Sequence, residues 1–188
     1  MRVMAFNQRF VCLLAVLAAL LVIPVDAAER FTATAAVKNA SGAAATMPLT
    51  IVVDKFATAA ERESLIKALK EGTTSERDLM GRRPTVGSLQ IGGRSTPIKY
   101  AYAVSTGEHR LITIATGSPI VLDGAHAAAL AAQPGFDIGF VLLELPTSGA
   151  GTGDLVPATK VRVERDNSIV TEHASPDIVK LSNVTVGK

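Results

Sequence analysis

The feature that most constrains the fold is a series of short apolar runs, each ended by a cluster of turn residues. Runs of about 4–8 residues that alternate or are β-branched are typical of β-strands. Because tight turns join most of these runs, neighbouring strands are expected to pair antiparallel. The predicted strands are residues 31–37, 48–56, 85–91, 97–104, 110–116, 137–145, 154–165, 168–173 and 177–186, with 120–122 as a further short candidate.

One segment changes to a helical period. Thr58 and Glu61 have the spacing of a capping box, in which each residue's side chain accepts a hydrogen bond from the other's backbone. Apolar residues at helical spacing follow, and Gly72 is placed to end the helix in the left-handed conformation. We therefore predict a helix over residues 59–71 and a second, shorter helix within 75–81.

These elements predict a mainly β fold. We expect an antiparallel barrel of about eight strands, with one helical hairpin inserted after the second strand, because closing a sheet removes its exposed edges. A β-sandwich is the alternative that the same pattern allows. No internal repeat or linker divides the chain, so residues 28–188 are expected to form a single β-rich domain.

The first 27 residues have the three parts of an export signal. Arg2 and Arg9 come first, an unbroken apolar stretch over 10–25 follows, and Ala27 offers a small residue for cleavage. The stretch is shorter than the about 20 residues that a spanning helix needs. We predict that residues 1–27 are a cleaved signal peptide, with an uncleaved anchor as the alternative. The mature domain is then periplasmic or secreted and has no stable membrane anchor.

Cleavage would also change the composition of the chain. It removes Cys12, the only cysteine, so the mature domain would have no disulfide, no thiol nucleophile and no thiolate ligand. It removes two of the 19 basic and one of the 17 acidic residues, which leaves a net charge of +1. Nucleic-acid binding normally needs a concentrated basic patch. We therefore expect no nucleic-acid partner.

The sequence carries no recognisable catalytic or cofactor motif. His109, His126 and His173 lack the spacing of metal ligands, and neither a G-x-S-x-G elbow nor a phosphate-binding P-loop is present. The glycine-rich run 149–154 is interpreted as a hairpin loop, because no helix follows that could hold an anion. We expect no catalytic residues, no metal and no cofactor, and an enzyme is less favoured than a non-enzyme.

One predicted strand offers a candidate ligand surface. Its alternation places Ile98, Tyr100, Tyr102 and Val104 on one face. In a barrel, such a face is either part of the packed interior or the wall of a ligand cavity. The helical hairpin could cover a barrel mouth, which is a common place for a ligand site, or it could simply cover an open edge or end.

The order of the features resembles a group of exported bacterial proteins of unknown function. The resemblance covers nearly the whole chain after the signal peptide and implies a single exported domain, but it supplies no activity and no site residues. It is carried by the segments ERFTATA, TIVVDKF followed by ERESLIKALKEG, PTVGSLQI, ITIATGSPI and GTGDLVPATKVRVERDNSIV.

Three functional hypotheses follow, in descending order of support. The first is an exported binding module for a small, partly apolar molecule. The second is a protein–protein interaction or structural domain of the cell envelope or the extracellular space. The third is a hydrolase-type enzyme, which would need a histidine and a carboxylate to meet in one cleft. The sequence specifies neither the ligand nor the oligomeric state.

Overall fold

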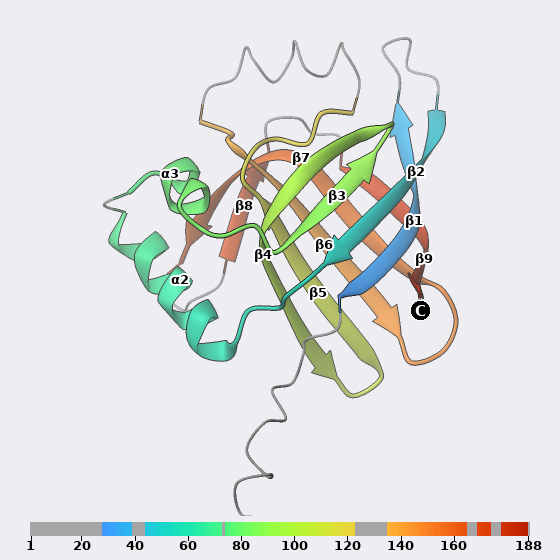
Figure 1. Cartoon of the computed structure of the whole chain (residues 1–188), viewed down its shortest axis with the longest axis horizontal. Coiled ribbons are helices and arrows are strands. Elements are labelled where there is room, and N and C mark those ends of the chain that lie inside the picture. Colours follow the sequence, from blue (N-terminus) through green and yellow to red (C-terminus); the bar gives the residue numbers. More distant parts are fainter. Residues whose placement is uncertain are drawn as a thin grey trace, which may run out of the picture.

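The computed structural model describes residues 28–38, 44–72, 74–122, 135–164, 169–173 and 178–187. Over these residues the chain forms one nine-stranded antiparallel sheet with two short helices on its outer side (Figure 1). The predicted signal peptide, residues 1–27, lies outside the described residues. Within the described ranges, no helix combines the length and the apolarity that crossing a membrane requires.

The sheet closes on itself as a barrel. Its strands are β1 (Glu29–Lys38), β2 (Ala44–Val53), β3 (Gly87–Ile91), β4 (Arg94–Thr106), β5 (His109–Thr116), β6 (Ile138–Pro146), β7 (Gly151–Val163), β8 (Ile169–His173) and β9 (Val179–Gly187). Each strand from β1 to β6 pairs with the next strand in the sequence. Strand β9 pairs with both β7 and β1 and so closes the ring, and β8 pairs with β7. The ring therefore contains eight strands, and β8 is an extra strand beside the second half of β7. The predicted barrel is confirmed.

Two helices interrupt the strands between β2 and β3, as predicted. They are α2 (Ala59–Glu71) and α3 (Glu76–Gly81). Both halves of the capping box form: the Glu61 amide donates to Thr58 Oγ1 at 3.2 Å, and the Thr58 amide donates to Glu61 Oε2 at 2.7 Å. Gly72 ends α2 with a φ of 60°, a conformation that glycine adopts without steric cost.

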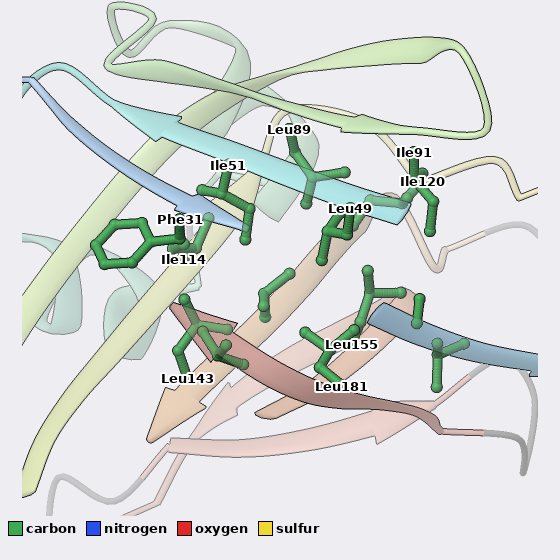
Figure 2. Close-up of a cluster of buried hydrophobic side chains, with 14 of the residues drawn as sticks. Phe31, Leu49, Ile51, Leu89, Ile91, Ile114, Ile120, Leu143, Leu155 and Leu181 are labelled. Carbon is green, nitrogen blue, oxygen red and sulfur yellow. The ribbon is translucent and has the colours of Figure 1, made fainter. Parts of the chain in front are cut away.

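Apolar side chains fill the inside of the barrel. Figure 2 shows side chains from facing strands meeting there, and several of them, among them Leu89 and Ile114, have no exposed surface. Close-packed interiors of this kind are typical of eight-stranded barrels. The barrel cluster includes Phe31, Leu49, Ile51, Leu89, Ile91, Ile98, Ile112, Ile114, Ile120, Val141, Leu143, Leu155 and Leu181.

A β-bulge divides β4 into two parts that face different ways. The register with β5 shifts between Ile98 and Tyr100, which makes Lys99 an extra residue. Ile98 therefore points into the barrel cluster, whereas Tyr100 and Tyr102 pack outside the barrel. Val104 lies near the end of the strand and is 40% exposed. The expectation that these four side chains share one face is wrong, because the bulge reverses the alternation.

Two glycines of the predicted loop 149–154 belong instead to β7. A Cβ on Gly151 would lie 2.3 Å from the carbonyl oxygen of Glu144, and one on Gly153 would lie 2.6 Å from that of Leu142. Glycine at these positions lets β7 approach the backbone of β6 more closely than a larger residue would. The glycine-rich run is thus partly strand, and it has a packing role.

Candidate functional site

A second apolar cluster lies outside the barrel, beneath the two helices. Leu65 of α2 and Met80 of α3 pack there against Tyr100 of β4, Ala115 of β5 and Ile138 of β6. We call this set of residues the outer cluster. It attaches the helices to one side of the barrel, which is their position in Figure 1.

A groove opens beside the outer cluster, between the helices and the barrel wall. Its volume is about 340 Å³, near the lower end of the range of about 300–1,000 Å³ that is usual for ligand sites. We call it the helix–barrel groove. Its lining comes from four stretches of chain: residues 55–57, residues 61 and 64 of α2, residues 82–84 and 86 after α3, and residues 99–101 of β4.

The lining combines aromatic and apolar surface with positive charge. Phe56, Val86 and Tyr100 supply much of the apolar part. The charged lining residues are four basic ones and one acidic one, so their net charge is +3: Lys55, Arg82, Arg83, Lys99 and Glu61. A positive groove with aromatic walls is suited to molecules that carry both an apolar part and a negative charge.

Tyr100 presents a neutral aromatic ring to the groove. Burial raises the pKa of its phenol to about 12, against a smaller lowering by the positive charge of Arg62. The ring stacks on Tyr102 with 6.5 Å between centroids and 20° between planes. Arg83 lies 5.7 Å from the Tyr100 ring centroid and Arg62 lies 5.5 Å from that of Tyr102. Each tyrosine thus makes a cation–π contact with one arginine.

Lys99 is held in a defined position by the bulge. Its Nζ donates to the carbonyl oxygen of Arg83 at 3.2 Å and to Thr85 Oγ1 at 3.1 Å. Its stem lies against Gly117, where an added Cβ would sit 2.9 Å from Lys99 Cγ. Both acceptors are neutral oxygens, so these hydrogen bonds fix the ammonium without cancelling its charge.

A partly buried carboxylate, that of Glu76, holds helix α3 against the barrel. Glu76 Oε2 accepts a hydrogen bond from the backbone amide of Val161 in β7 at 2.9 Å. Burial raises the pKa of the Glu76 carboxyl, and the hydrogen bond from Val161 offsets part of that rise. Nearby, Arg77 Nη1 lies 3.7 Å from Asp137 Oδ1, in an ion pair whose arginine is largely exposed. The Glu76 hydrogen bond holds α3, and with it the residues that follow α3, against β7.

The structure separates the four residues that the sequence nominated. Tyr100 lines the groove, and Tyr102 stacks beside it without lining it. Ile98 is inside the barrel, and Val104 is exposed away from the lining. Sequence reasoning missed the basic residues of the lining. The available signal was a lysine, Lys99, inside an otherwise apolar alternating strand.

The histidines form no described catalytic or metal cluster. His109 Nδ1 lies 3.3 Å from Glu144 Oε1 on the neighbouring strand, but both side chains are about half exposed and neither lines the groove. His126 and the side chain of His173 lie outside the described part of the chain. Among the residues that are described, no group of three or more His, Cys, Asp or Glu side chains could hold a metal ion.

Comparison of this chain with models of known protein families, with curated proteins and with solved structures found no match.

Proposed function

We propose that this protein is an exported binding domain that holds a small, partly apolar molecule in the helix–barrel groove. The observation that carries the proposal is the groove itself, about 340 Å³ of space with aromatic lining and polar groups that converge on it. Sites of this form are the usual binding sites for small molecules. Export is part of the proposal because the first 27 residues have the pattern of a signal peptide.

The rest of the fold supports this location. The barrel interior is occupied by apolar side chains, which favours a ligand site on the outside of the barrel. Regular elements flank the groove: a complete capping box stabilises the start of α2, and Glu76 holds α3 on β7. A binding site whose walls are held in this way loses little entropy when a ligand enters.

Native mass spectrometry of the full chain, expressed in a bacterial host and gently purified, tests the proposal. We expect an additional mass that is lost on denaturation. Ser64→Tyr should reduce its occupancy, because Ser64 lines the groove from α2. Glu63→Tyr is the matched control, since this exposed neighbour is not in the lining. Equal occupancy in both variants would place the ligand elsewhere, and a processed N-terminus in the periplasmic fraction would support export.

Strand β8 favours a second candidate function, self-association. In the described part of the sheet β8 pairs only with β7, so its other edge has no partner strand, and Val170 on it is 43% exposed. An open edge can pair with the same edge of a second copy. The same mass spectra would then show a dimer that Val170→Lys dissociates. A monomer at high micromolar concentration would contradict this candidate.

A further inference from the structure

We propose that the occupant of the helix–barrel groove is an anion, with a carboxylate, phosphate or sulfonate head bound by Arg83 and Lys99 and an apolar part against Tyr100. This inference rests on the proposed function and specifies its ligand class. The charge of the lining, the two cations and the apolar surface beside them support it.

The charge of the groove is only partly balanced by protein. Lys55 pairs with Glu61 at 3.3 Å, and this is the one ion pair formed within the described lining. None of the ion pairs between described residues includes Arg82, Arg83 or Lys99. Positive charge gathered in a partly enclosed groove attracts anions more strongly than the same charge spread over an open surface.

Arg83 has unused hydrogen-bonding capacity. Its Nε atom is buried and has no hydrogen-bond partner among the described residues. Leaving a buried donor without a partner is unfavourable, so an oxyanion that reaches this guanidinium is bound favourably. The cation–π contact with Tyr100 orients the guanidinium, whose planar fork matches the two oxygens of a carboxylate or phosphate.

Lys99 brings a second cation to the same place. Its Nζ donates to the backbone carbonyl of Arg83, and both residues line the groove. An anion in the groove is therefore attracted by both positive charges. The bulge in β4 and the packing of the Lys99 stem on Gly117 position this ammonium before any ligand binds.

The apolar surface of the groove indicates what kind of group the ligand carries beside its charged head. Phe56, Val86 and the neutral ring of Tyr100 line the groove beside the cations. An engineered cavity of about 150 Å³ holds one benzene molecule, so a groove of about 340 Å³ has room for a two-ring group with a small head. An aromatic or branched aliphatic carboxylate, or a phosphate monoester or sulfonate that carries such a group, fits both features.

Three probes with the same ring system and different heads test the inference. Naphthoate, naphthylmethanol and naphthylmethylammonium are titrated into the purified protein, and amide NMR shifts locate and quantify binding. We expect naphthoate to bind at least about tenfold more tightly than the alcohol, with the ammonium weakest. Raising the salt from about 50 to about 500 mM should weaken naphthoate but not the alcohol. Inorganic phosphate, which lacks the apolar part, should bind more weakly than naphthoate.

Variants then assign the head-group site. Arg83→Met and Lys99→Met should each lower naphthoate affinity about fivefold or more and leave the alcohol unchanged. Lys67→Met is the control, because it removes one positive charge from an exposed position on α2 outside the lining. Arg83→Lys keeps the positive charge but loses the two parallel N–H donors of the guanidinium. It should therefore retain part of the preference for naphthoate over the alcohol. The amide spectra show whether each variant is folded. If a variant does not fold, the salt dependence of naphthoate binding to the unchanged protein still tests the anion preference.

The outcomes separate this inference from the function on which it rests. Equal binding of naphthoate and the alcohol in the groove would overturn the inference and leave the proposed function standing. Phosphate binding as tight as naphthoate would overturn the apolar part of it. A preference for naphthoate that survives both Met variants would remove Arg83 and Lys99 from the site. If no probe shifts any groove amide at millimolar concentration, the proposed function fails with the inference.

Discussion

The barrel interior and the layer under the helices are built on the same strands but have different chemistry. Inside, the packed side chains are aliphatic or aromatic hydrocarbon, and many of the largest are less than 2% exposed. Outside, an apolar cluster borders a groove with a net positive lining. The comparison indicates that the two regions have different roles. The apolar core stabilises the fold, and the less regular surface layer can hold the polar and charged groups that a binding site needs.

Strand β4 takes part in both regions, which makes it the best place to see how they differ. Before the bulge, Ile98 contributes to the barrel cluster; after it, Tyr100 contributes to the outer cluster. Lys99, the extra residue between them, lines the groove. One additional residue in a strand is therefore enough to direct an aromatic ring and a cation out of the core and into a candidate site.

Truncating one leucine in each region should change the free energy of unfolding more inside the barrel than under the helices. Leu89 has no exposed surface inside the barrel, so Leu89→Ala should lower the free energy of unfolding by about 2–5 kcal/mol. Leu65 is 6% exposed beside the open groove, so Leu65→Ala should cost about 2 kcal/mol or less, because the site can relax. Denaturant unfolding measures both values.

Hydrogen exchange tests whether the helical layer and the barrel open separately. Leu65→Ala should speed exchange in α2 while the barrel strands keep their protection, because local opening of the helices leaves the closed sheet intact. Leu89→Ala should instead reduce protection in all strands together. Uniform loss of protection in the Leu65→Ala variant would show that the helical layer and the barrel are one cooperative unit, and the proposed division would be wrong.

Replacing a glycine by alanine in each of the two regions gives a second comparison, with smaller changes in stability. A Cβ on Gly139 would lie 2.5 Å from Cγ1 of buried Ile120, so Gly139→Ala should cost about 1–3 kcal/mol through overpacking. A Cβ on Gly117 would meet the stem of Lys99, a side chain that can move. Gly117→Ala should cost less than about 1 kcal/mol in thermal or denaturant unfolding but weaken naphthoate binding. An equal loss of stability in the two variants would contradict the comparison.

Local patterns in the sequence were sufficient to predict the regular parts of the fold. The capping box of Thr58 and Glu61 and the left-handed Gly72 fixed both ends of α2, because their partners lie within one helical turn. The short strands and tight turns predicted the antiparallel barrel, and the pairing of β6 with β7, which closes the sheet, distinguishes the barrel from the sandwich. These features depend on contacts between residues that are close in the sequence or repeat at a constant period.

The groove could not be predicted in the same way. The residues around Lys99 alternate between large apolar side chains and small or charged ones without a break. The bulge is seen only in the register of β4 with β5. The alternation therefore placed Tyr100 on the face of Ile98. The lining brings together Phe56, Arg83 and Lys99, which come from separate segments and converge only after the helices dock. Sites assembled by tertiary contact leave little periodic signal in the chain.

A smaller change in stability is expected at the Glu76 carboxylate, which joins α3 to β7. Glu76→Ala removes the acceptor of the Val161 amide and should lower the free energy of unfolding by about 1–2 kcal/mol at neutral pH. Glu76→Gln keeps an oxygen acceptor without the charge. Because burial raises the pKa of Glu76 in the folded protein, the fold favours the neutral carboxyl. We expect Glu76→Gln to be at least as stable as the unchanged protein at pH about 7.

The pH dependence gives the sign of this effect. A carboxyl with a raised pKa contributes stability that is fully present below its unfolded pKa and is lost as the pH rises through the folded pKa. The stability difference between Glu76→Gln and the unchanged protein should therefore be smallest near pH 4 and should grow in favour of Gln toward neutral pH. Denaturant unfolding at several pH values measures it. If the unchanged protein instead gains on Glu76→Gln as the pH rises, the charged hydrogen bond to Val161 outweighs burial, and α3 is held to the barrel by its charge.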